Sequence, residues 1–360
     1  MKALIAMSGG VDSSVAAYLM CRQNFDCIGC TMKLYNNEDI GINRKHTCCS
    51  LDDVEDARSV AYKLGMPYYV FNFTDCFKDT VIEKFVKSYE NGITPNPCID
   101  CNRYLKFDKL YTRAKVLGCD YIVTGHYARI EKENGKFSLK KAIDRTKDQS
   151  YVLYSMTQQQ LASTLFPLGN MTKTEVRQAA LQNGFINAEK PDSQDICFVP
   201  DGDYGAFLSR YTGKDYKSGN FVLSNGKVIG KHRGITNYTV GQRKGLGISY
   251  SQPLYACKIC AQSNDIVLGT KDELLCDKAD VCDFNWISGE VPQKPFRAKV
   301  KIRYRAPEEW ATVTATCENE VSIVFDKPQR AVTPGQAAVV YDGDTVVGGG
   351  TIKQFSRWII

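Results

Sequence analysis

The sequence contains no run of about 18 apolar residues, so it offers no segment that could cross a membrane as a helix. A loop of functional appearance begins within the first ten residues, which leaves no room for a signal peptide. No internal repeat and no low-complexity segment are visible, and the three histidines are scattered. We therefore expect a cytoplasmic protein without a membrane partner, and neither a repeat array nor a secreted scaffold.

Fifteen cysteines are many for such a protein, but their spacing is not that of a small disulfide scaffold. In a reducing compartment, cysteines serve as thiols, metal ligands or catalytic groups. A length of 360 residues predicts two or three domains, and 43% hydrophobic residues are enough to build their cores.

The strongest local signal is the stretch Met-Ser-Gly-Gly-Val-Asp-Ser-Ser at residues 7–14. It follows an apolar run at 3–6, typical of a buried strand, and precedes a helical pattern at 15–20. Gly9 and Gly10 allow backbone torsions that are closed to other residues and a close approach to a ligand. The first amides of the helix favour an anion. The stretch is neither a Walker A motif nor Gly-x-Gly-x-x-Gly, and it predicts a phosphate or pyrophosphate site.

Strand and helix patterns alternate from residue 1 to about 200, which predicts a mostly parallel sheet covered by helices on both faces. Strands are expected at 27–32, 68–73 and 121–124, and capped helices near 50–64 and 172–183. Ligands bind such sheets at the carboxyl ends of the strands. That edge would collect the glycine-rich loop, Met32, Gly125 and the loop at 94–101.

After about residue 203 the helical patterns fade and turn signals multiply, so we expect a basic linker region and then a β-barrel. Residues 296–305 alternate apolar and basic, which predicts one strand with a basic face open to phosphates. Nine lysines and arginines between 204 and 258 accompany one acid, Asp215, and six basic residues between 293 and 307 accompany none. Such blocks favour a polyanionic partner, and solvated lysines without a partner are the simpler alternative.

Cys98-x-x-Cys101 lies in a proline-rich loop before a predicted helix, whose N-terminus would lower a thiol pKa. Cys197 lies in another polar, turn-like loop. Three interpretations are open: sulfur transfer with a persulfide cysteine and a resolving cysteine, an iron–sulfur cluster with an open position, and structural zinc, which normally needs a fourth ligand. Beside a pyrophosphate loop, these cysteines favour activation of an oxygen and its replacement by sulfur.

Further motifs accompany these features along the chain. They are Ser50-Leu-Asp-Asp-Val-Glu-Asp-Ala57, Thr94-Pro-Asn-Pro-Cys-x-x-Cys-Asn102, Thr124-Gly-His-Tyr-Ala128, Lys147-Asp-Gln-Ser-Tyr151, Ser193-Gln-Asp-Ile-Cys-Phe198, Gly230-Lys-His-Arg-Gly-Ile235, Gly241-Gln-Arg-Lys-Gly245 and Arg303-Tyr-Arg305. Together with residues 7–14, which resemble the PP-loop of ATP pyrophosphatases, they resemble the MnmA family of tRNA-specific 2-thiouridylases in order and over essentially the whole chain.

The resemblance implies an α/β fold with a Rossmann-like parallel sheet of the adenine nucleotide alpha-hydrolase type, followed by a small basic linker domain and a C-terminal β-barrel. The ATP-binding catalytic domain would span 1–203, the central tRNA-binding domain 204–270, and the tRNA-contacting barrel 271–360.

The resemblance also implies a tRNA-uridine 2-sulfurtransferase. ATP would adenylate the C2 oxygen of the wobble uridine, and sulfur from a persulfide on Cys197 would replace it, with Cys101 able to form a disulfide with Cys197. ATP and Mg²⁺ would bind at Ala6, Met7, Ser8, Gly9, Gly10, Val11, Asp12, Ser13, Met32 and Gly125, where Asp12 would hold the metal or orient the loop. The target base and the tRNA would meet Asn96, Pro97, Cys98, His126, Lys147, Asp148, Gln149, Tyr304, Arg305 and Gln336. A sulfur donor protein or relay, fed by a cysteine desulfurase, would be the protein partner.

One departure concerns position 98, where well-known members carry an aspartate and this chain has Cys98. The extra thiol supports an alternative route in which Cys98, Cys101 and Cys197 hold a 4Fe–4S cluster whose free iron carries hydrosulfide. Two other classes are also open: an amidating PP-loop ligase, which needs ammonia but no essential cysteine pair, and an RNA-binding protein with an inactive ATP site.

Overall fold

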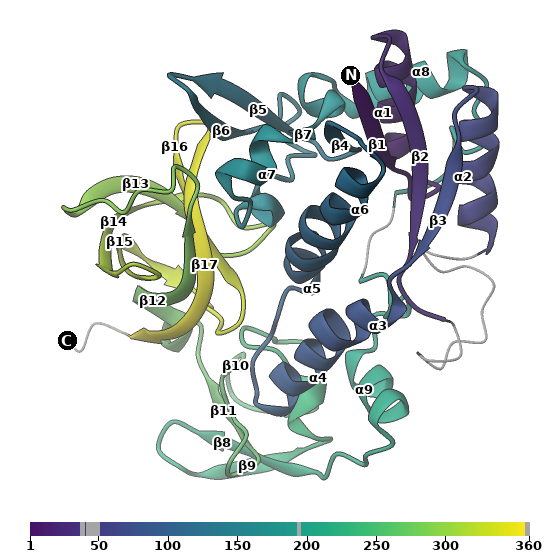
Figure 1. The fold of residues 1–360 in the computed structure, drawn as a ribbon. Helices are drawn as coiled ribbons and strands as arrows, with labels where there is room; N and C mark the ends of the chain where they lie inside the picture. Colours follow the sequence, from purple (N-terminus) through teal and green to yellow (C-terminus); the bar gives the residue numbers. More distant parts are fainter. Residues whose placement is uncertain (37–39, 41–50, 193–195, 357–360) are drawn as a thin grey trace.

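The computed structural model describes residues 1–36, 40, 51–192 and 196–356, with side chains up to residue 353. Ser50, the expected cap of the helix near 50–64, lies outside the described residues. Figure 1 shows three parts: an α/β unit that contains the N-terminus, a four-stranded sheet (β8–β11), and a barrel formed mainly by the C-terminal strands.

The α/β unit is built on a five-stranded parallel sheet with the order β3-β2-β1-β4-β7. Its strands are β1 (Lys2–Ala6), β2 (Asp26–Lys33), β3 (Tyr68–Asn72), β4 (Tyr121–Thr124) and β7 (Thr164–Leu165). The three strands expected from the sequence are confirmed to within one residue at each end. The strand order reverses between β1 and β4, and open α/β sheets bind their ligands at such a switch point.

Side chains of β1 alternate between two apolar cores, one on each face of the sheet. Ala3 and Ile5 belong to the core under α1, α2 and α8, whereas Leu4 belongs to the core under α4 and α6. This explains the near-continuous apolar run of a strand that is buried on both sides. The helices of the unit are α1 (Val11–Arg22), α2 (Leu51–Lys63), α3 (Thr74–Phe77), α4 (Glu83–Glu90), α5 (Pro97–Asp100), α6 (Leu110–Val116), α7 (Gln158–Ala162) and α8 (Lys173–Gln182), with short 3₁₀ turns at Ser150–Leu153 and Pro167–Asn170.

Two helices of the unit contain π-helical segments. One segment, Lys78–Ile82, joins α3 to α4, and a longer one, Cys101–Lys109, joins α5 to α6. Such segments are rare and are found frequently at functional sites. The second one begins at Cys101, so the local widening of the helix falls on a predicted catalytic residue.

The central region, expected from the sequence to be a small basic linker domain, is a compact β unit with its own sheet. It begins with the helix α9 (Tyr204–Thr212), which Asp203 caps by accepting from the amide of Ala206 at 2.9 Å. A four-stranded mixed sheet follows, in the order β10-β11-β8-β9. Its strands are β8 (Gly219–Leu223), β9 (Val228–His232), β10 (Tyr255–Cys260) and β11 (Asp265–Gly269).

The C-terminal strands follow the order β12-β15-β14-β13-β16-β17. They close into a barrel because the first strand, β12, pairs with its neighbour β15 and also with the last strand, β17. These strands are β12 (Leu275–Trp286), β13 (Phe296–Lys301), β14 (Glu309–Cys317), β15 (Glu320–Arg330), β16 (Ala337–Asp342) and β17 (Thr345–Ser356). The ten-residue strand expected at 296–305 is therefore wrong, because the chain turns after Lys301.

A hairpin of the α/β unit, β5 (Ala128–Glu133) and β6 (Lys136–Lys141), extends the barrel sheet through the pairing of Lys140 with Thr345. An apolar cluster lies at the same junction and joins Leu139 and Tyr151 of the first unit to Val339 of the barrel. Among the residues that the structure describes, no helix is both long enough and apolar enough to span a bilayer.

Candidate active site

The glycine-rich loop links the end of β1 to the first turn of α1, at the switch point of the sheet. Gly9 has a φ of +75°, and a Cβ atom there would lie 2.4 Å from the backbone oxygen of Asp53 in α2, so the position requires glycine. The Ser13 and Ser14 hydroxyls donate to the carbonyl of Gly10 at 3.0 and 3.1 Å. Ser13 Oγ also accepts from the amide of Ser8 at 3.2 Å. The result is a tight turn against a helix N-terminus, the arrangement that an anion site needs.

Two side chains that were not predicted from the sequence support this loop, one by bonding the loop itself and the other by bonding α2. The buried Asn187 donates to the Gly9 carbonyl and to Ser14 Oγ, both at 2.9 Å. Lys190 donates to Asp53 and Asp56 in α2 at 2.6 and 2.7 Å. Lys190 lies seven residues before Cys197, and only this proximity in the sequence could have indicated its role.

Asp12, in the first turn of α1, is held by neighbours on both of its oxygens. Lys173 Nζ donates to Oδ1 at 2.7 Å and to Oδ2 at 2.8 Å, and the Tyr127 hydroxyl donates to Oδ1 at 2.7 Å. Burial and the neighbouring Asp12 raise the pKa of Tyr127 well above its usual value, so it remains a hydrogen-bond donor. Of the two roles expected for Asp12, this arrangement favours orientation of the loop and does not resemble a Mg²⁺ site.

The other residues predicted to bind ATP surround this turn. Gly125, after β4, approaches so closely that a Cβ atom would lie 2.7 Å from the amide nitrogen of Ser13. Met32 lies near the end of β2, on the other side of β1. Met7 and Val11 are buried in the core under α1 and therefore support the loop, whereas Ser8 is exposed. Ala6 ends β1 and is partly exposed.

The cysteine pair lies at the start of a helix. Asn96 caps α5 by accepting from the amide of Cys98 at 3.2 Å, and Pro97 is the first helical residue. Cys98 is exposed, whereas Cys101 is half-buried where the π segment begins. Burial raises the pKa of Cys101 to about 11, and Lys106 opposes this rise only in part. The expected lowering is therefore wrong for Cys101, because desolvation of the thiolate outweighs the effect of the helix N-terminus at Pro97.

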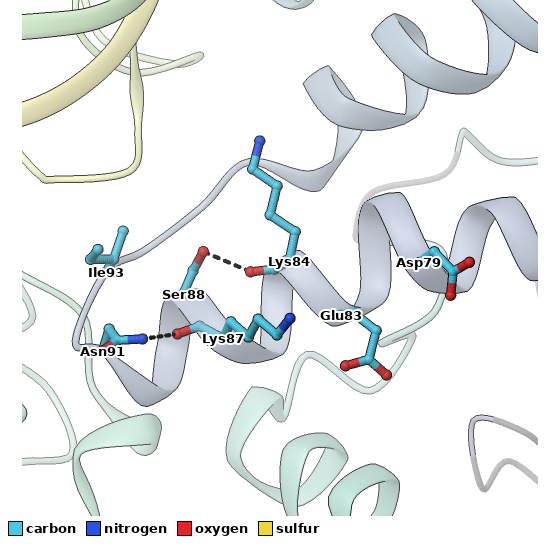
Figure 2. Close-up of a pocket in the computed structure, with 7 residues that line it drawn as sticks. All are labelled: Asp79, Glu83, Lys84, Lys87, Ser88, Asn91 and Ile93. Carbon is cyan, nitrogen blue, oxygen red and sulfur yellow. Dashed lines mark hydrogen bonds between the residues drawn. The ribbon is translucent and has the colours of Figure 1, made fainter.

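Asp100, between the two cysteines, is directed to α4. It is buried and accepts from Lys84 Nζ at 2.6 Å, and burial raises its pKa against the effect of Lys84. Figure 2 shows Lys84 projecting away from Lys87 on the same helix. A pocket of about 370 Å³ lies along α4 and is lined by Asp79, Glu83, Lys84, Lys87, Ser88, Asn91 and Ile93. Its lining carries both signs of charge and favours no single class of ligand.

Cys197 lies between α8 and α9, and its carbonyl accepts from the Tyr35 hydroxyl at 2.8 Å. Cys101 and Cys197 are both half-buried against the same apolar core beside the sheet. In the described part of the chain, which omits 37–39, 41–50, 193–195 and 357–360, no group of three or more His, Cys, Asp or Glu side chains is arranged to hold a metal ion. Cys98, Cys101 and Cys197 as placed therefore do not fit a 4Fe–4S cluster.

The predicted tRNA-contacting segment at 147–149 is fixed by internal bonds. Asp148 accepts from Ser150 Oγ at 2.8 Å, and Gln149 Oε1 accepts from the amide of Tyr127 at 2.9 Å. Lys147 pairs with Asp192 at 2.7 Å while 36% of its side chain stays exposed. Within this segment, Lys147 is thus the residue that presents a positive charge near the surface.

His126 is buried between Phe107 and Phe166 and shares a 2.7 Å hydrogen bond with Thr124 through Nδ1. Burial, together with Lys106, lowers its pKa well below the usual value. The ring is therefore neutral at pH 7 and does not offer a positive charge to a phosphate. Its contact with tRNA stays a prediction.

Two of the barrel residues predicted to contact tRNA also bond the α/β unit. The Tyr304 hydroxyl donates to the carbonyl of Asp148 at 3.2 Å, and Gln336 Nε2 donates to the carbonyl of Thr94 at 2.9 Å. Arg305, next to Tyr304, is exposed. The barrel therefore contacts both the 147–149 segment and the loop that leads to the cysteine pair.

The basic face expected at 296–305 is only partly open. Arg303 is inserted between units, where it donates to the carbonyls of Val240 and Ala331 at 2.9 and 3.1 Å. Arg297 pairs with Asp326. Lys299 remains exposed beside Trp310, a residue that is 50% exposed and whose ring centroid lies 5.7 Å from the Lys299 ammonium group. In the central unit the nine basic residues counted from the sequence are all exposed, although Lys214 pairs with Glu90 and Arg210 with Asp201.

A parallel sheet with this glycine-rich loop at its switch point, joined to two β units, defines an ATP-using enzyme of the PP-loop class. Family models match three consecutive stretches: the "tRNA methyl transferase HUP domain" at residues 1–201, the "tRNA methyl transferase PRC-barrel domain" at 205–270 and the "Aminomethyltransferase beta-barrel domain" at 276–352.

Relatives of known name match over the full length and are thiouridylases. The chain is 48% identical to the tRNA-specific 2-thiouridylase MnmA of Clostridioides difficile, covering 98% of each chain. Identity is 49% to the enzyme of the same name from Clostridium acetobutylicum and 50% to that from Acetivibrio thermocellus, each over 98% of this chain and 99% of the relative. The chain belongs to the MnmA family of tRNA-specific 2-thiouridylases.

Proposed function

We propose that this chain is a tRNA-uridine 2-sulfurtransferase that uses ATP to exchange the C2 oxygen of the wobble uridine for sulfur. The observation that carries this conclusion is the full-length relationship to 2-thiouridylases at 48–50% identity. The glycine-rich loop at the switch point and the two half-buried cysteines beside the same sheet supply the two halves of that chemistry.

In the first half, the C2 oxygen of the uracil attacks the α-phosphorus of ATP, and pyrophosphate leaves. Ala6, Met7, Ser8, Gly9, Gly10, Val11, Asp12, Ser13, Met32 and Gly125 form the ATP site in this proposal. The amides at the start of α1 would receive the phosphates, and Asp12 would orient the turn through Lys173. Mg²⁺ would screen the phosphate charge, and oxygens of the ATP phosphates and of water would supply most of its ligands.

In the second half, the terminal sulfur of a persulfide on Cys197 attacks C2, and AMP leaves with the original oxygen. The thiolate of Cys101 then attacks the Cys197 sulfur, so that a Cys101–Cys197 disulfide forms and the thiocarbonyl of 2-thiouridine is released. A dithiol reductant restores both thiols, and a sulfur donor protein or relay reloads Cys197. Burial raises the pKa of Cys101 to about 11 in the free chain, so we expect its thiolate to form when tRNA binding changes its surroundings.

The tRNA would contact all three units. The target base would meet Asn96, Pro97 and Cys98, and the anticodon region would meet Lys147, Asp148, Gln149, Tyr304, Arg305, Gln336 and, through the adjacent turn, His126. The exposed basic residues of the central unit would follow the RNA backbone. We divide the chain accordingly into 1–203, 204–270 and 271–360.

Cysteine variants test the two halves separately. Cys197→Ser and Cys101→Ser should each abolish 2-thiouridine, as measured by mass spectrometry of tRNA nucleosides. Each should still release pyrophosphate in the presence of tRNA, because adenylation precedes sulfur transfer. Retained 2-thiouridine formation by both variants would contradict the proposed roles of the two cysteines. An amidating ligase would form no 2-thiouridine, and its ATP-dependent activity would survive both substitutions. Pyrophosphate release that does not depend on tRNA, or no release at all, would contradict the proposed order.

The cluster route is tested on the same protein. Purification without oxygen, followed by iron and sulfide analysis and strict iron removal, should leave thiolation intact if Cys197 carries a persulfide. Loss of thiolation with iron, and its return with reconstitution, would contradict the persulfide route.

A further inference from the structure

A single carboxylate, that of Asp192, binds three cations from two segments: Lys147 of the 147–149 segment, and Lys173 and Arg177 of α8. Its Oδ2 accepts from Lys147 at 2.7 Å, and its Oδ1 lies 2.8 Å from Lys173 Nζ and 3.0 Å from Arg177 Nη2. Although burial opposes the effect, the bonds from Lys147 and Lys173 lower the pKa of Asp192 to about 2. The group is therefore an anion at every physiological pH.

Two of these cations lie where substrate phosphates are expected. Lys173 is nearly buried and also bonds Asp12 in the first turn of α1, beside the loop proposed for the ATP phosphates. Lys147 lies in the 147–149 segment proposed to contact RNA. The Asp192 carboxylate thus pairs both with Lys173 beside the proposed ATP site and with Lys147 of the proposed RNA-contacting segment.

Local charge balance explains why such an anion is needed. Lys147, Lys173 and Arg177 together carry three positive charges, and Asp12 and Asp192 carry two negative charges. Without Asp192, Lys147 and Arg177 would lose this carboxylate while Lys173 would keep Asp12, and repulsion among the three cations would turn the long side chains outward. With Asp192, the cations are held in place before an anionic substrate arrives.

We propose that Asp192 is a positioning residue that substitutes for substrate phosphates in the ligand-free enzyme and competes with them for Lys147 and Lys173. This inference rests on the proposed function. It predicts that removal of the carboxylate strengthens the binding of both anionic substrates. A merely structural residue would weaken binding when it is removed, so the two roles give opposite signs.

The first test measures the affinity of an unmodified tRNA transcript at several salt concentrations. Asp192→Asn should tighten binding roughly threefold to tenfold, since a charge-assisted bond to Lys147 becomes available to a phosphate. The slope of log K against log salt should become more negative by about 0.7 to 0.9, the value for one added phosphate contact. Asp192→Glu should retain wild-type affinity. Glu55→Gln, which releases Arg58 on the outer face of α2, is the matched control and should change nothing.

A double-mutant cycle assigns the gain. In a Lys147→Met background, Asp192→Asn should change tRNA affinity by less than about twofold, because the competing cation is absent. The double variant removes the positive charge of Lys147 together with the negative charge of Asp192. It should therefore remain folded even if charge repulsion destabilises the single variant Asp192→Asn. Weaker or unchanged tRNA binding by Asp192→Asn, with unchanged circular dichroism, would overturn the inference.

The second test uses α,β-methylene-ATP and involves no RNA. Asp192→Asn should bind this analogue roughly threefold to tenfold more tightly through Lys173. An unchanged or weaker affinity would overturn the inference at the ATP site. If the wild-type chain binds the analogue but no tRNA, the proposed function fails, and the ATP measurement still decides the role of Asp192.

Discussion

Gly9 offers the sharpest test of how the ATP loop is built. Its φ of +75° lies in the left-handed region, and its missing Cβ would lie 2.4 Å from the oxygen and 2.7 Å from the Cα of Asp53. These are backbone atoms at the start of α2, so rotation of a side chain cannot relieve the overlap. Gly9→Ala therefore forces either the loop or α2 to move.

The cost has two parts that the structure separates. The left-handed conformation itself costs alanine about 1–2 kcal/mol. The overlap displaces Asp53, which accepts a 2.6 Å bond from Lys190. The Lys190 side chain is 32% exposed, so solvent screens this ion pair, and weakening the pair adds about 1 kcal/mol to the cost. Gly118 has a φ of +67° with open space around its Cβ position, so Gly118→Ala carries only the first part. Gly9→Ala should therefore cost about 2–3 kcal/mol and Gly118→Ala about 1–2 kcal/mol.

Urea denaturation followed by circular dichroism measures the stability difference, and calorimetric titration with α,β-methylene-ATP measures the effect on the site. We expect Gly9→Ala to lose at least tenfold in analogue affinity and Gly118→Ala to bind like the wild type. Gly125→Ala is a control that has the steric overlap but not the left-handed strain. Its Cβ would lie 2.7 Å from the amide nitrogen of Ser13, while the φ of Gly125 is ordinary. If Gly9→Ala matched Gly118→Ala in both stability and affinity, the contact with Asp53 would not determine the shape of the loop.

Three further outcomes follow from particular side chains. Alkylating reagents react with the thiolate, so the alkylation rate of Cys101 should be low at pH 7.5 and rise about tenfold per pH unit toward its pKa of about 11. Peptide mass spectrometry measures this rate, and a plateau below pH 9 would contradict the effect of burial. Because burial and Lys106 lower the pKa of His126, its ring proton resonances should stay constant from pH 8 to pH 5, and a midpoint near 6.5 would show that the ring reaches water. Trp310, half-exposed between Arg297 and Lys299, should stack on a base of the bound tRNA, so Trp310→Ala should cost about 1–3 kcal/mol in binding. Tyr62→Ala, at an 87% exposed site on α2, is its control, and equal affinities would exclude this face from the RNA contact.

Local patterns were sufficient for the elements that position the ATP loop. The apolar run at β1, the glycine pair and the helix that follows are confirmed, and the capping box of α8 is present, with Thr172 and Glu175 bonded to each other's backbone amides. These features depend on neighbours within four residues, so a single sequence contains the information.

Features that depend on distant contacts were not predictable. Alternation at 296–301 identifies two faces of a strand, but it cannot tell that Arg303 is enclosed by Val240 and Ala331. The hairpin β5–β6 joins the barrel through Lys140 and Thr345, which lie far apart in the sequence. For Cys101, the sequence showed the helix start, whereas burial decides the pKa and arises from tertiary packing.

The same long-range contacts determine what the barrel contributes to the active site. The amide of Thr94 donates to the carbonyl of Pro334 at 3.1 Å, and Gln336 bonds the Thr94 carbonyl in return. Gly335, with a φ of +90°, lies so close that a Cβ atom would be 2.9 Å from the Thr94 oxygen. Two residues later Asn96 caps the helix that carries Cys98 and Cys101. The barrel turn at 334–336 therefore fixes the loop from which the cysteine helix starts, so a barrel that binds RNA also holds the thiol loop in register with that RNA.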